Sequence, residues 1–161
     1  MSAARSIAGR LRESWMRLRL RACASVGRGV KLRGRVLVRG GGAVRLGDGV
    51  LLDGATAPIE LHAGPGAELT VGSGTVLCAG TSIEAMRSVS IGARCRIGAF
   101  GKILDNAFHS VGDLFSRPAS APVEIGDGAL LGPRCIVLPG ARVQAGEVLR
   151  PGTVRKARGP R

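Results

Sequence analysis

Aromatic side chains are nearly absent from this chain of 161 residues: they form 2% of it, and tyrosine does not occur. Because buried aromatic rings normally supply much of a core, this core must be built from many small aliphatic layers. No apolar run reaches the roughly 18 residues that a membrane-spanning helix needs, and arginines stand where a secretion signal would have its apolar segment. A hydrophobic fraction of 45% nevertheless excludes general disorder.

Cysteine is also too sparse to indicate a disulfide framework or a metal site. Cys23, Cys78, Cys95 and Cys135 are widely separated and show no C-x-x-C spacing. Cys95 and Cys135 fall at small-residue positions of the repeat described next, which favours buried, reduced thiols. We therefore expect no metal and a cytoplasmic protein.

Glycine, in contrast, is abundant, with 26 residues, and it follows a repeat of six. From Val123 to Val154, every sixth residue is aliphatic: Ile125, Leu131, Val137, Val143 and Leu149. Three residues after each stands a turn residue, glycine in four of five cases: Gly128, Arg134, Gly140, Gly146 and Gly152. A period of six fits neither a lone helix nor a lone strand. It is typical of a parallel β-helix, whose short strands are joined by turns of positive φ.

The same period extends back to Val26, with phase slips after Val44 and Ile83 and an insertion of one residue around Pro58. Residues 26–103 and 123–154 amount to 110 residues, which gives about six coils of three hexads each. The predicted fold is therefore all-β, with a solenoid domain at 26–156 and a basic tail at 157–161.

Positive charge is concentrated at the front of the chain. The net charge is +13, and residues 1–45 hold 12 Lys and Arg with a single acid, Glu13. Residues 1–25 place apolar side chains, among them Trp15 and Leu18, at helical spacing, which predicts a short basic amphipathic α-helix. It can cap the first coil or lie on an anionic membrane surface, and the two roles are compatible. A transit peptide has the same composition, whereas nucleic acid is an unlikely partner because stacking aromatics are missing.

One long loop, residues 105–122, interrupts the repeat. It contains Asp105, Phe108 and His109, and its end is rich in Pro, Ser and Ala. A long excursion from an otherwise minimal solenoid is where functional residues are expected.

The hexads, the D-x-x-x-H spacing of Asp105 and His109, and the continuation APVEIGDGALLGPRCIVLPGARV resemble the left-handed β-helix acyltransferases. The nearest branch is that of the maltose and galactoside acetyltransferases and the polysaccharide O-acetyltransferases. The resemblance covers residues 26–156. It implies left-handed coils, a homotrimer with active sites between neighbouring solenoids, and acetyl-CoA or another acyl-CoA as donor. The implied acceptor is a sugar or glycan precursor, in the cytoplasm or at the inner face of the membrane.

The resemblance also implies roles for individual residues. His109 matches the general base that deprotonates the acceptor, a task that suits an imidazole near neutral pH. Asp105 is expected to orient that imidazole, to hold a sugar hydroxyl, or simply to shape a turn. Glu84 and Phe108 are expected to contact the acceptor. The residues expected to contact CoA are Gly132, Pro133, Gly152, Thr153, Arg155 and Lys156.

Other functions require residues or domains that can be looked for in the sequence. A γ-type carbonic anhydrase needs three zinc-binding histidines, and this chain has two. His62, in the turn-like stretch ELHAGPG, is expected to be a surface residue. A serine acetyltransferase-like or N-acetyltransferase activity remains an alternative, although the large helical domain of the serine acetyltransferases is missing. A catalytically silent trimeric scaffold, or a membrane-recruited interaction protein, is the alternative outside the enzymes.

Overall fold

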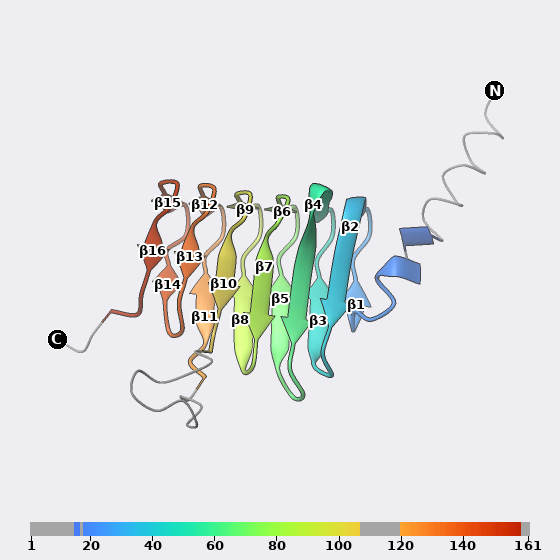
Figure 1. Ribbon diagram of the computed structural model, residues 1–161, viewed down its shortest axis with the longest axis horizontal. Helices are drawn as coiled ribbons and strands as arrows, with labels where there is room; N and C mark the ends of the chain where they lie inside the picture. The colour runs from blue at the N-terminus through green and yellow to red at the C-terminus, as the bar shows by residue number, and fades with distance from the viewer. Residues whose placement is uncertain (1–14, 17, 107–119, 159–161) are drawn as a thin grey trace.

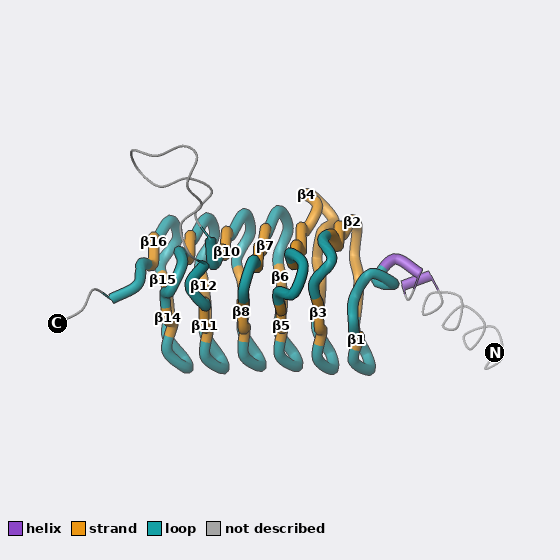
Figure 2. Tube along the Cα trace, turned by 90° about the horizontal axis from the view of Figure 1, so that it is seen from below, coloured by secondary structure: helices purple, strands orange, loops and turns teal. Residues whose placement is uncertain are grey.

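The computed structural model describes residues 15–16, 18–106 and 120–158. Parallel strands wind into a left-handed β-helix, and its first and last coils lie at opposite ends of the long axis (Figures 1 and 2). The predicted fold class is confirmed. Within the described residues, no helix has the length and apolar character to cross a bilayer.

The first face of the solenoid is a six-stranded parallel sheet. In spatial order its strands are β1 (Ser25–Val26), β3 (Ala43–Leu46), β5 (Glu68–Val71), β8 (Ser88–Ile91), β11 (Val123–Ile125) and β14 (Arg142–Val143). Each coil contributes one strand to this face, so the sheet counts six coils, as the hexad arithmetic predicted.

A ten-stranded sheet wraps around the other two faces. Its strands are β2 (Lys31–Arg39), β4 (Leu51–Ala63), β6 (Val76–Leu77), β7 (Ser82–Ala85), β9 (Arg96–Ile97), β10 (Lys102–Leu104), β12 (Leu130–Leu131), β13 (Ile136–Val137), β15 (Val148–Leu149) and β16 (Val154–Arg155). The long strands β2 and β4 run through the corner and belong to both faces. The start of β4 therefore pairs with β6, and its end pairs with β7.

The core consists of the predicted aliphatic residues stacked coil upon coil. On the face that contains β6, β9, β12 and β15, the register aligns one buried residue from each of five successive coils. These residues are Leu52, Leu77, Ile97, Leu131 and Leu149, and none is more than 4% exposed. Burying each such side chain contributes about 2 kcal/mol, so many thin layers replace the missing aromatic core.

The turns have the backbone conformation that the repeat requires. All five turn residues of the last coils have positive φ, between 58° and 74°. Arg134 is among them at 58° although it is not glycine. A left-handed residue with a Cβ costs about 1–2 kcal/mol, so the stacked neighbouring turns must impose this geometry on Arg134.

Two regions add to or differ from the sequence prediction. The corner of β4 holds residues 55–58 where the first coil has only Arg35, so the insertion near Pro58 is longer than the one residue predicted. At the N-terminal end, residues 15–16 and 18–19 are helical. Leu20 follows them, is 1% exposed and belongs to the core cluster, so it covers the open end of the first coil.

Candidate functional site

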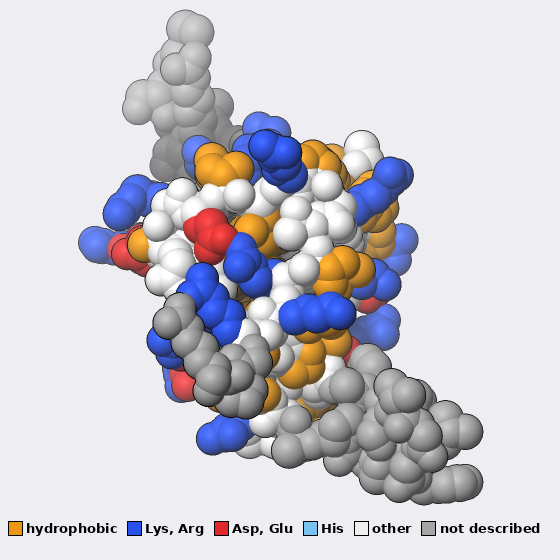
Figure 3. Space-filling view, turned by 90° about the vertical axis from the view of Figure 1, so that its left-hand side faces the viewer, with side chains coloured by type: hydrophobic (Ala, Val, Ile, Leu, Met, Phe, Trp, Pro, Cys, Tyr) orange, Lys and Arg blue, Asp and Glu red, His pale blue; other side chains and the backbone are white. Residues whose placement is uncertain are grey.

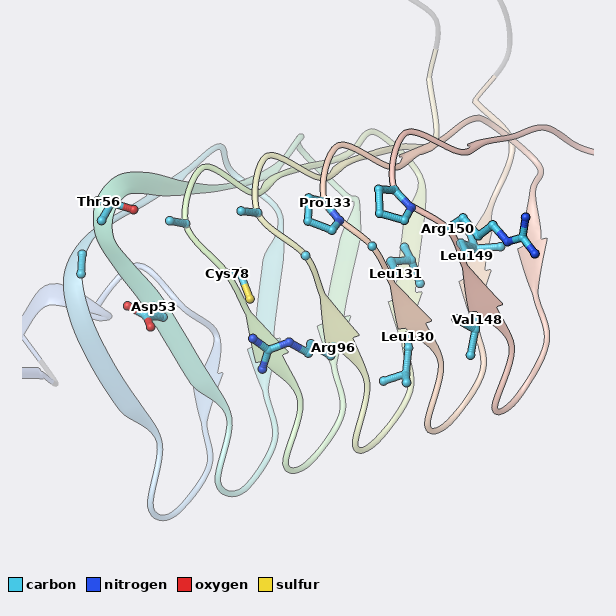
Figure 4. A pocket seen from close by; sticks show the side chains of 16 residues that line it. Asp53, Thr56, Cys78, Arg96, Leu130, Leu131, Pro133, Val148, Leu149 and Arg150 are labelled. Atoms are coloured by element: carbon cyan, nitrogen blue, oxygen red, sulfur yellow. The ribbon is translucent and has the colours of Figure 1, made fainter.

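A groove of about 670 Å³ runs over the later coils, along β9, β12 and β15 and the turns that follow them (Figure 4). The register aligns Arg96, Leu130 and Val148, so their outward side chains form one column. Leu130 is 44% exposed and Val148 is 64% exposed. The groove therefore has an apolar strip on its surface, in a protein whose other large aliphatic side chains are mostly buried.

The turns beside this strip are packed too tightly for side chains. A Cβ on Gly132 would lie 2.6 Å from the Pro151 nitrogen, and a Cβ on Gly98 would lie 2.6 Å from the Pro133 nitrogen. Only glycine fits at either position. One wall of the groove is consequently backbone and proline ring, against which an extended ligand can lie closely.

Two cations flank the apolar strip. Arg96 lies on its β9 side and Arg150 follows β15 on the other side (Figure 4). Asp53, also on the wall, has Arg33 as its ion-pair partner at 3.9 Å. Seen from the C-terminal end, Lys and Arg side chains stand around exposed apolar ones (Figure 3). The groove thus suits a ligand with an apolar arm and an anionic end.

The residues predicted to bind CoA divide into two groups. Gly132 and Pro133 line the groove. Gly152 and Thr153 lie in the turn after Pro151 and do not line the groove. The Thr153 hydroxyl donates a hydrogen bond to the Arg150 carbonyl at 2.7 Å. Lys156 is exposed beyond β16.

Arg155 has a different position from the one expected of a phosphate ligand. It pairs in register with the buried Val137, at the C-terminal end of the core, and its guanidinium forms an ion pair with Glu147. The cations that do line the groove, Arg96 and Arg150, were not predicted from the sequence. One signal was available, because Arg96 directly precedes a core hexad residue, as Leu130 and Val148 do, and such residues must point outward.

Asp105 is fully buried at the start of the loop. Its carboxylate accepts hydrogen bonds from the backbone amides of Met86, Arg87 and Ser88, each at 2.7 Å. These contacts fix the turn between β7 and β8 to the end of β10, which is the turn role left open above. Its predicted partner His109, and Phe108, lie outside the described residues.

Glu84 is in β7, and its Oε1 lies 3.6 Å from Nδ1 of His62. His62 is within β4 rather than in the turn that follows it, and its side chain is 43% exposed. Among the residues that the structure describes, no group of three or more His, Cys, Asp or Glu side chains is arranged to hold a metal ion.

The described cysteines are all free. Cys95 and Cys135 are buried in turns, where their Sγ atoms lie 3.2 Å from the Gly126 carbonyl and 3.1 Å from the Arg150 carbonyl. Burial raises the pKa of the Cys95 thiol, and it raises the pKa of Cys23 to about 11. Cys23 and Cys78 are both partly exposed, and of the four cysteines Cys78 is the one that lines the groove.

No known protein family matches the chain, and no curated protein sequence matches it. Two solved structures are similar in part. One is a mutant of AntD, an N-acyltransferase from Bacillus cereus, in complex with dTDP-4-amino-4,6-dideoxyglucose and coenzyme A; it is 15% identical, with a TM-score of 0.46, covering 87% of this chain and 76% of that one. The other is a hexapeptide transferase family protein from Anaplasma phagocytophilum, 17% identical, with a TM-score of 0.32, covering 85% and 76%. Similarity at this level assigns neither a family nor an activity.

Proposed function

We propose that the protein is an acyl-CoA-dependent O-acyltransferase, with acetyl as the acyl group and a sugar or glycan precursor as acceptor. The observation that carries this proposal is the groove, where Leu130 and Val148 form an apolar strip between Arg96 and Arg150. Acyl-CoA has a long pantetheine arm that a diphosphate joins to a phosphorylated adenosine. The strip and the close-packed turns can bury the arm, and the arginines can form charge-assisted hydrogen bonds with phosphate.

In this proposal His109 is the general base. Its neutral imidazole takes the proton of the acceptor hydroxyl, and the freed oxygen attacks the thioester carbonyl. The C–S bond breaks, an ester forms, and the proton passes to the CoA sulfur. A positioned base of this kind typically contributes about 10²–10⁴-fold in rate.

The active form of the enzyme in this proposal is a homotrimer. The groove follows β9, β12 and β15, whereas the loop that carries His109 leaves the solenoid after β10, on another face. A cleft between two copies would bring the base of one protomer to the groove of its partner. Sedimentation equilibrium measures this directly, and a strictly monomeric active protein would contradict it.

Labelled acetyl-CoA offered with simple sugars, nucleotide sugars and amines tests the activity. Transfer to a hydroxyl supports the proposal, and transfer to an amine supports the N-acetyltransferase alternative. If no acceptor is acetylated, the catalytically silent scaffold is supported. We expect His109→Ala to abolish transfer with an unchanged melting temperature and oligomeric state. Unimpaired transfer by that variant would remove His109 as the base.

We also propose that the N-terminal end docks on an anionic membrane surface. Trp15 and Leu18 are 57% and 60% exposed, and the Arg19 guanidinium lies 3.9 Å from the centre of the Trp15 ring. The adjoining first coil adds exposed cations, among them Lys31 and Arg35. Exposed apolar groups among cations suit a headgroup layer, where both are satisfied.

A further inference from the structure

In the part of this basic protein that the structure describes, nearly all carboxylates have an ion-pair or hydrogen-bond partner. Among the described residues, five acids pair with an arginine, and two more accept hydrogen bonds from backbone amides. The former are Asp48, Asp53, Glu68, Glu124 and Glu147, and the latter are Asp105 and Asp127. Within that part of the chain, Glu60 has no such partner and Glu84 has only His62. In a chain with 24 Lys and Arg, two such carboxylates in one place call for an explanation.

Glu60 and Glu84 line the same hollow, of about 100 Å³, on the outer face of β2, β4 and β7. The register aligns Arg39 with His62 and Glu84 in one column, and Glu60 with Ser82 in the next. These residues alternate along their strands with buried aliphatic residues, so their side chains face outward together. The hollow has room for about three water molecules, which suits part of a small ligand.

The hollow adjoins the start of the loop. Glu84 pairs with Leu104, and the Glu84 carbonyl accepts a hydrogen bond from the Asp105 amide at 3.3 Å. Asp105 in turn holds the turn that follows β7. Glu84 therefore lies one strand away from the start of the loop, and Glu60 lies one strand further along the sheet.

We infer that this hollow is the acceptor subsite and that it recognises an amino sugar, a polyhydroxylated ligand that carries an ammonium group. The inference rests on the proposed function. Carboxylates accept hydrogen bonds only, so Glu60 and Glu84 match an ammonium group and neighbouring hydroxyls. Arg39 and Ser82 can donate to ring oxygens. A phosphorylated sugar is disfavoured here, because its phosphate would face two like charges.

The test is a titration followed by NMR on the full chain. In the His109→Ala protein His62 is the one remaining histidine, so its Cε1–H resonance reports on the hollow without overlap. Glucosamine, glucose and glucose 1-phosphate are the three probes. We expect a saturable shift with affinity in that order, and about tenfold weaker glucosamine binding in each of Glu60→Gln and Glu84→Gln, as for the loss of one charge-assisted hydrogen bond.

Glu124→Gln is the matched control, since it removes the same charge from another face and should leave the affinity unchanged. Tighter binding of glucose 1-phosphate, no shift with glucosamine, or equal affinity in the Glu60→Gln and Glu84→Gln variants would overturn the inference. Acetyl-CoA binding is measured separately. If acetyl-CoA binds and glucosamine does not, the inferred acceptor subsite is wrong and the proposed acyltransferase function is retained. If glucosamine binds and acetyl-CoA does not, the proposed acyl donor is wrong and the protein is a sugar-binding solenoid.

Discussion

Replacing Asp105 with asparagine should destabilise the middle of the solenoid by about 3 kcal/mol. The carboxylate accepts three backbone hydrogen bonds at 2.7 Å while fully buried. Asparagine offers one oxygen and turns an N–H₂ group toward amide donors. At least one charge-assisted bond, at about 1.5–3 kcal/mol, is then lost, and a buried amide is left unsatisfied at about 1–3 kcal/mol. The easier burial of the neutral side chain offsets part of the total.

Urea unfolding followed by circular dichroism measures this loss as a lower midpoint. Asp127→Asn is the matched control, because Asp127 sits in an exposed turn, where its carboxylate accepts one hydrogen bond, from the Ala93 amide at 2.8 Å. We expect that control to lose less than about 1 kcal/mol. Equal losses in the two variants would refute the claim that Asp105 holds the turn after β7.

Three further perturbations test other parts of the structure. Ile97→Asn should lower the free energy of unfolding in urea by about 3–5 kcal/mol, because Ile97 is fully buried. Leu130→Asn, on the exposed strip, should lower it by less than about 1 kcal/mol. Equal losses in the two variants would contradict the stacked core. Maleimide labelling at pH 8 should modify Cys78 well before Cys23, whose thiolate forms only near its pKa of about 11. Mass spectrometry follows the two sites, and labelling of Cys23 as early as Cys78 would contradict the raised pKa of Cys23. Lys31→Gln with Arg35→Gln should weaken binding to phosphatidylserine-containing vesicles by about 30-fold, whereas Arg94→Gln with Lys102→Gln should not. An equal loss in the two double variants would show that the binding depends on net charge alone.

The sequence predicted most of the fold because each hexad can be identified from a few neighbouring residues. A buried aliphatic residue such as Leu131 and a turn residue such as Gly128 sit at fixed spacing, and neighbouring coils repeat them. The length of the corner in β4 was not predictable, since residues 55–58 shift the pairing with β2, from Gly34 opposite Gly54 to Val36 opposite Ile59, and aliphatic residues then stack again. The φ of Arg134 was predictable from its place in the repeat, not from its residue type.

The candidate site was less predictable, because it depends on which residues of successive coils lie side by side. Coils of unequal length bring His62 beside Glu84 and Arg96 beside Leu130, and no local spacing encodes these pairs. The three amides that bind Asp105 come from a turn 17 to 19 residues earlier. Gly132 and Pro133, which were expected to contact CoA, line the groove because tight turns at hexad spacing have to stack.

The central claim, that acyl-CoA occupies the groove, is tested most directly by labelling Cys78. This thiol lies on the groove wall (Figure 4), and Cys23, which precedes β1 and does not line the groove, provides an internal control. If the claim holds, acetyl-CoA at about 100 times its Kd should slow maleimide labelling of Cys78 by about 100-fold and leave Cys23 unchanged, with the protection weakened in Arg96→Gln. Labelling of Cys78 at an unaltered rate under saturating acetyl-CoA would contradict it.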